Sequence, residues 1–132
     1  MNMSENNENK KKFLYKGFGY AFQGIGACIK KEWNMKMHCL MVLLVILAGI
    51  ILKLSVMEWC VCVILFGQIL SLELVNTAIE AVVDLVTEER KPLAKAAKDM
   101  AAGAVLIAAV MAAAAGCMIF VPKVLAFAGA LL

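Results

Sequence analysis

Three carboxylates and one amide interrupt the otherwise apolar stretch LELVNTAIEAVVDL, residues 72–85. The acids are Glu73, Glu80 and Asp84, and the amide is Asn76. At about 100° per helical residue, Glu80 and Asp84 lie within roughly 20° of the direction of Glu73, with Asn76 about 60° to one side. Carboxylates in lipid are costly, so this stripe predicts a functional site. The alternative is interhelical hydrogen bonds or ion pairs with lysines, and it is strongest for Asp84.

Other charged residues are expected at the same membrane face, namely Glu32, Lys95, Lys98 and Asp99. Mg²⁺ prefers one or two carboxylates together with phosphate oxygens. A lysine neutralises charge on a transferring phosphoryl group, and a further carboxylate can take a proton from an alcohol. These groups suit phosphoryl transfer, although acids and lysines also line ion pathways. Neither a G-x-x-x-x-G-K-[ST] motif nor the glycine-rich signature of protein kinases occurs, so a nucleotide site would have another design.

The composition places these residues in a membrane protein. Of the 132 residues, 64% are hydrophobic and 17% charged, against about 45–50% and about 25% in soluble domains. The net charge of +3 is small. We interpret the lysines as topology signals and expect no nucleic-acid partner. The five cysteines form no paired C-x-x-C pattern, so we interpret them as small buried hydrophobes.

The hydropathy pattern predicts an all-α integral membrane protein. Residues 1–12 are polar and predicted to be disordered, and residues 13–132 form one membrane domain. It begins with an amphipathic surface helix over 13–31. Three transmembrane helices follow, at about residues 37–56, 59–86 and 100–121. Between and after them we expect a polar hinge over 32–38, a turn at Glu58 and Trp59, a charged turn over 87–99, and a helix end near Pro122.

The basic residues predict the orientation of the chain in its membrane. They concentrate before the first span and between the second and third, which places the N-terminus in the cytoplasm and the C-terminus outside. The second span, 59–86, is about 40 Å long at 1.5 Å per residue and exceeds the roughly 30 Å hydrocarbon core, so its acidic C-terminal end projects into the cytoplasm. The third span is rich in alanine and glycine, which favours close helix packing and a homo-oligomer with composite sites.

Five motifs resemble the prokaryotic diacylglycerol kinase and undecaprenol kinase family over about residues 13–121. They are E-x-x-N-T-A-I-E-A-V-V-D at 73–84, A-K-D at 97–99, A-A-G-A-V-L at 101–106, G-Y-A-F-Q-G at 19–24 and E-x-N-x-K-x-H at 32–38. The resemblance implies a homotrimeric membrane kinase that transfers the γ-phosphate of MgATP to a lipid hydroxyl. It also implies active sites between protomers.

The resemblance further implies roles for individual residues. Glu73 resembles the general base, and Asn76 supports it. Nucleotide contacts are implied for Tyr20, Glu32, Glu80, Glu89, Lys98 and Asp99, of which Glu32 and Glu80 resemble the carboxylates that bridge Mg²⁺.

The form of the motifs favours the Gram-positive branch and undecaprenol as substrate, with diacylglycerol as the alternative. A small proton-coupled transporter and a structural oligomer are candidates from other classes. Glu73 is about 15 residues, or roughly 22 Å of helical rise, from Glu58. It therefore lies past the membrane midplane toward the cytoplasm and its ATP, which favours a kinase over a transporter.

Overall fold

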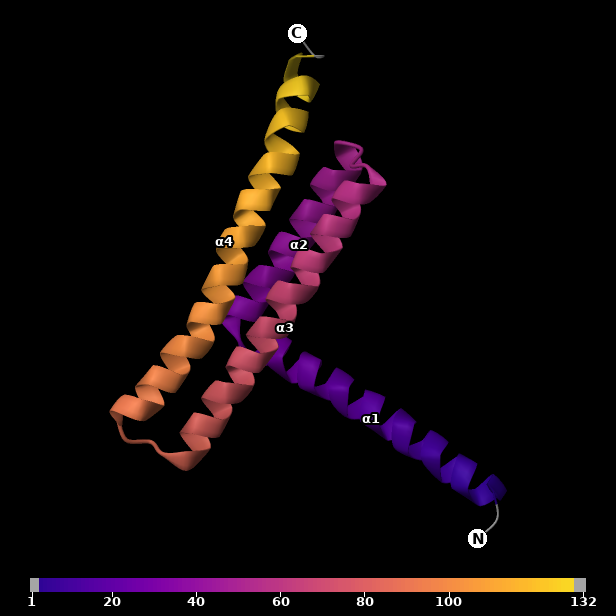
Figure 1. Ribbon diagram of the computed structural model, residues 1–132, viewed down its shortest axis with the longest axis vertical. Coiled ribbons are helices and arrows are strands. Elements are labelled where there is room, and N and C mark those ends of the chain that lie inside the picture. The colour runs from indigo at the N-terminus through magenta and orange to yellow at the C-terminus, as the bar shows by residue number, and fades with distance from the viewer. Residues whose placement is uncertain (1–2, 130–132) are drawn as a thin grey trace.

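The structure, a computed structural model, describes the backbone of residues 3–129 and the side chains of residues 15–129. The described residues form four helices: α1 Met3–Lys31, α2 Trp33–Ile51, α3 Val56–Val86 and α4 Pro92–Gly129. Helices α2, α3 and α4 are each long and apolar enough to cross a membrane. The predicted all-α fold with an N-terminal helix and three spans is therefore confirmed (Figure 1).

Helix α3 is the centre of the molecule, because it contacts each of the other three helices. Helices α2, α3 and α4 lie alongside one another, and α1 leaves this bundle from the start of α2 (Figure 1). Few side chains are buried within one chain; Met35, Cys62 and Ala108 are among them. Large apolar side chains such as Leu106 and Ile107 are exposed instead, as expected of helices that face lipid or another copy.

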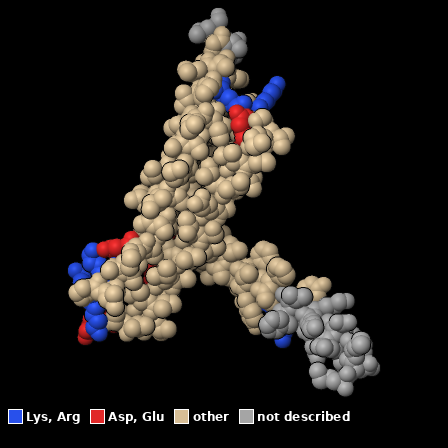
Figure 2. Space-filling model, in the orientation of Figure 1, with Lys and Arg blue, Asp and Glu red and all other residues tan. Residues whose placement is uncertain are grey.

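The spans differ in length, and this sets the shape of the site. Helix α2 has 19 residues and α3 has 31, or about 28 Å against about 46 Å at 1.5 Å per residue. The C-terminal part of α3 and the first turns of α4 extend past the start of α2 (Figure 1). Charged side chains gather there and at the opposite end of the bundle, with an uncharged belt between them (Figure 2).

The N-terminal half differs from the predicted boundaries in two ways. Helix α1 begins at Met3, whereas disorder was predicted over 1–12. Glutamate and lysine are good helix formers, and no glycine or proline precedes Gly17. The polar hinge predicted over 32–38 is reduced to Glu32, whose extended φ of −91° and ψ of 126° separate α1 from α2.

The turn between α2 and α3 lies earlier than predicted. It ends at Ser55, and Glu58 is already helical. Ser55 caps α3: its hydroxyl accepts from the Glu58 N–H, and the Glu58 carboxylate accepts from the Ser55 N–H in a reciprocal capping box. Lys53 turns the chain with a positive φ of 52°. Trp59 does not lie in the turn but packs against Gly49, where an added Cβ would approach its ring to 2.7 Å.

The two prolines also shift predicted boundaries. The charged turn is shorter than residues 87–99, because α4 begins at Pro92, where the fixed φ of proline suits the first helical position. The helix end predicted near Pro122 is wrong, since α4 continues through Pro122 to Gly129. Membrane helices tolerate an internal proline because neighbouring groups can satisfy the released carbonyl. Because α4 begins at Pro92, Lys95, Lys98 and Asp99 lie on its first turns.

Candidate active site

The polar stripe of α3 runs from the bundle interior to its surface. Glu73 is 2% exposed and Asn76 is 6% exposed, and among the side chains of residues 15–129 they are the only buried polar ones. Glu80 is half-buried. Asp84 is 64% exposed and accepts from the Lys98 ammonium of α4 at 2.5 Å. The ion-pair interpretation therefore applies to Asp84, while Glu73 and Asn76 stand apart as costly buried groups.

Titratable side chains from other parts of the chain lie near Glu73. Its Oε2 lies 4.0 Å from Nε2 of His38 on α2. Glu80, two turns along α3, and Glu32, at the α1–α2 junction, are close enough to interact with it electrostatically. The acids predicted as general base and metal ligands thus face the same region, although Glu32 and Glu73 are far apart in sequence.

Asn76 is only partly satisfied. Its amide Nδ2 donates to Oε1 of Glu80 at 3.2 Å. Its Oδ1 is buried without a hydrogen-bond partner among the described residues. A buried unpaired acceptor costs about 1–3 kcal/mol, so native proteins rarely leave one without a reason. The free oxygen marks a place for a donor from a ligand or from a second copy of the chain.

The acids fit a magnesium–nucleotide complex better than a free metal ion. In the part of the chain with described side chains, no group of three or more histidine, cysteine, aspartate or glutamate residues could hold a metal ion. Mg²⁺ needs only one or two carboxylates when phosphates and waters supply its other ligands. The carboxylates of Glu32 and Glu80, the predicted metal ligands, carry oxygens of this type. Lys31 already neutralises part of this charge, with its Nζ 3.4 Å from Glu32 Oε1.

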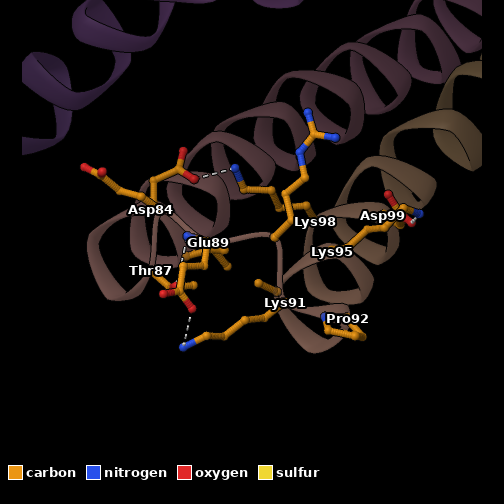
Figure 3. Close-up of a pocket in the computed structure, with 12 residues that line it drawn as sticks. Asp84, Thr87, Glu89, Lys91, Pro92, Lys95, Lys98 and Asp99 are labelled. Carbon is orange, nitrogen blue, oxygen red and sulfur yellow. Dashed lines mark hydrogen bonds and ion pairs between the residues drawn. The ribbon is translucent and has the colours of Figure 1, made fainter.

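A second polar region lies between the end of α3 and the start of α4. It is a cavity of about 560 Å³, lined by Asp84, Arg90 and Lys95 and by the predicted nucleotide contacts Glu89, Lys98 and Asp99 (Figure 3). The Lys98–Asp84 pair joins the two helices across it. Lys95 pairs with Asp99 at 2.5 Å, and Lys91 with Glu89 at 3.5 Å. The lining carries four basic and four acidic side chains, and the basic ones are of the type that binds an anionic ligand such as a polyphosphate.

The structure does not bring Tyr20 to these groups within one chain. Tyr20 is 68% exposed on α1 and lines neither this cavity nor the apolar groove between α2, α3 and α4. A contact that the sequence did not suggest docks α1 on α3, with Cys28 Sγ 3.4 Å from Thr77 Oγ1. The neighbour of Glu73, His38, was also missed. It is the only histidine in the sequence and ends the E-x-N-x-K-x-H motif, which was a signal for it.

Comparison of the sequence with known proteins identifies the family of this chain. The family described as "Prokaryotic diacylglycerol kinase" matches residues 19–120. The chain is 42% identical to the protein named "Undecaprenol kinase" from Bacillus subtilis (strain 168), covering 91% of this chain and 98% of that protein.

Two proteins named "Diacylglycerol kinase" also match. The one from Synechocystis is 38% identical over 85% of this chain and 65% of its own length. The one from Escherichia coli (strain K12) is 30% identical over 80% of this chain and 87% of its own length. The matched region contains α2, α3 and the polar cavity, and the chain belongs to the prokaryotic diacylglycerol kinase family of membrane lipid kinases.

Proposed function

We propose that this protein transfers the γ-phosphate of MgATP to the hydroxyl of undecaprenol at the cytoplasmic face of a bacterial membrane. The observation that carries the proposal is the buried, incompletely satisfied pair Glu73 and Asn76 on a membrane-spanning helix that leads to a cavity lined by charged side chains. Undecaprenol is favoured over diacylglycerol by the 42% identity to a protein named undecaprenol kinase over nearly its whole length.

In the proposed reaction Glu73 is the general base. As the lipid oxygen bonds to the γ-phosphorus, its proton moves to the Glu73 carboxylate. The bond from the γ-phosphorus to the bridging oxygen breaks, and ADP leaves with that electron pair. Asn76 holds Glu80 through its Nδ2 and has its Oδ1 free for a further partner. The burial of Glu73 keeps water from competing with the lipid hydroxyl.

The nucleotide is proposed to lie along the outer part of the stripe. Glu32 and Glu80 hold the Mg²⁺ that accompanies ATP, which when bound neutralises phosphate charge. Lys98 and Asp99 contact the phosphates from the first turns of α4, and Glu89 lines the same cavity. Lys98 is already held near α3 by Asp84, so its ammonium is positioned before the nucleotide arrives.

We further propose that the active unit is a homotrimer with its N-termini in the cytoplasm. One chain leaves Tyr20 away from the other predicted contacts and leaves Asn76 Oδ1 unpartnered, and a neighbouring copy can complete both. The α4 surface is rich in small residues that permit close approach, including Ala102, Gly103 and Ala113. Basic residues at the α1–α2 junction and at the α3–α4 turn support a cytoplasmic position for both.

A paired assay tests this function. Purified protein in lipid bilayers is given γ-labelled MgATP with undecaprenol in one sample and diacylglycerol in the other. Label appearing mainly in undecaprenyl phosphate supports the proposal. Label appearing mainly in phosphatidic acid would assign diacylglycerol as the substrate, and transfer to neither lipid would contradict the kinase function.

A further inference from the structure

An imidazole stands beside the carboxylate that we propose as the general base. His38 lies on the second turn of α2, and its Nε2 is 4.0 Å from Glu73 Oε2. Its side chain is 22% exposed. Among residues 15–129, no other basic side chain comes within 4.0 Å of a Glu73 oxygen. A buried carboxylate needs a donor to offset its desolvation, and His38 is the candidate.

Among the described residues, the lysines that form ion pairs do so with acids other than Glu73. The pairs are Lys31–Glu32, Lys91–Glu89, Lys95–Asp99, Lys98–Asp84 and Lys123–Glu58. The difference in chemistry matters, because an ammonium is a permanent charge that would hold the carboxylate in a strong ion pair. An imidazole offers a directional N–H from a planar ring and can orient Glu73 while leaving it able to accept a proton.

His38 also lines the apolar groove between α2, α3 and α4, which has a volume of about 550 Å³. Its other lining side chains are aliphatic, aromatic or sulfur-containing. On α3 the lining ends at Ile69, one helical turn before Glu73. A hydrocarbon chain in this groove would therefore reach its polar end at His38 and Glu73.

We propose that His38 is a positioning residue for Glu73, an inference that rests on the proposed function. Nε2–H donates to one carboxylate oxygen of Glu73, and the other oxygen is left to accept the proton of the lipid hydroxyl. His38 keeps its own proton throughout the transfer. The present 4.0 Å separation is longer than a hydrogen bond, as is common for catalytic contacts that tighten when substrate binds.

The test is a double-mutant cycle between the two residues, with undecaprenol and MgATP in bilayers. His38→Leu fills the space without a donor, and His38→Gln retains one. Met37→Ala is the matched control, because Met37 is the adjacent exposed residue of α2 and lines no described cavity. The kcat and both KM values are measured for each variant, in the Glu73 and in the Glu73→Gln background.

We expect His38→Leu to lower kcat about 10- to 100-fold, with KM for MgATP changed less than about twofold. His38→Gln should recover at least about fivefold of that loss, and Met37→Ala should stay within about twofold of wild type. In the Glu73→Gln background, His38→Leu should change kcat less than about twofold, because the group it positions is gone.

An equal loss of kcat in both backgrounds, or an unchanged kcat in His38→Leu, would overturn the inference. If His38→Leu does not yield a stable protein, His38→Ala replaces it in the cycle with the same criteria. A wild-type protein that phosphorylates no lipid would instead contradict the proposed function. An active wild type in which the His38 and Glu73 substitutions act independently would contradict this inference alone.

Discussion

Two acids of helix α3, Glu58 at its start and Glu73 in its second half, are satisfied very differently. Glu58 accepts from the Ser55 N–H at 2.6 Å and from Lys123 Nζ at 3.1 Å. Glu73 is buried with one imidazole 4.0 Å away, and the neighbouring Asn76 Oδ1 has no partner in the described chain. An acid in a membrane helix thus serves structure where its hydrogen bonds are complete, and is available for chemistry where they are not.

Removing the charge of Glu73 should have the largest effect. Glu73→Gln preserves size but cannot take a proton, so we expect kcat to fall about 10²- to 10⁴-fold. Binding of MgATP should change less than about threefold, because Glu73 is not among the proposed nucleotide contacts. Labelled phosphate transfer and binding of a non-hydrolysable nucleotide measure the two quantities. Near-normal turnover would show that Glu73 is not the base.

Glu80 should affect the metal requirement more than the chemical step. Glu80→Gln keeps an oxygen that can accept from Asn76 Nδ2, so the local fold is preserved. It loses a charged magnesium ligand, and we expect the Mg²⁺ concentration for half-maximal activity to rise on the order of tenfold, equivalent to about 1.4 kcal/mol. A magnesium titration at fixed ATP measures this. An unchanged titration curve would remove Glu80 from the metal site.

Two lysines of the α3–α4 cavity provide a matched pair. Lys98 faces α3 through Asp84, whereas Lys95 pairs with Asp99 on its own helix. Lys98→Ala should raise KM for ATP about tenfold, since a charge-assisted contact contributes about 1.5–3 kcal/mol. Lys95→Ala should raise it less than about threefold. Equal effects would indicate that the cavity attracts ATP through overall charge and not through Lys98.

The smallest effect on turnover is expected at Glu58, whose carboxylate has both its partners. Glu58→Gln weakens the ion pair with Lys123 and the helix cap. We expect a fall of a few degrees in the thermal unfolding midpoint and a kcat within about twofold of wild type. Lys123→Met should lower the midpoint less, because it leaves the capping box in place. A large loss of kcat in Glu58→Gln would contradict the distinction between Glu58 and Glu73.

Much of the fold could be predicted because its signals are local. The hydropathy of three long segments determines the spans, and the spacing of Glu73, Glu80 and Asp84 places them on one helix face. The sequence of α3 alone could not predict that Glu73 is buried, Glu80 half-buried and Asp84 exposed. The burial of each side chain depends on how far α2 and α4 extend along that face. The capping box at Ser55 and Glu58 is a local signal that was available and overlooked.

The neighbours of the site depend on tertiary packing and were not predictable from spacing. His38 meets Glu73 only because α2 runs back along α3, and Cys28 meets Thr77 only because α1 docks there. Pro122 misled the prediction because the rule that proline ends a helix comes from helices in water. The nucleotide contact expected of Tyr20 stays a prediction, because Tyr20 is exposed on α1 and lines neither described cavity.

A single-turnover measurement of Glu73→Gln beside Glu58→Gln tests the contrast between these two acids of α3 most directly. Each protein is preloaded with labelled MgATP in the same bilayer, and transfer to undecaprenol is followed in time. We expect the Glu73→Gln rate to be at least about 100-fold below that of Glu58→Gln, in line with the loss of a general base. Rates within about threefold of each other would contradict the assignment of the buried, unsatisfied acid as the catalytic one.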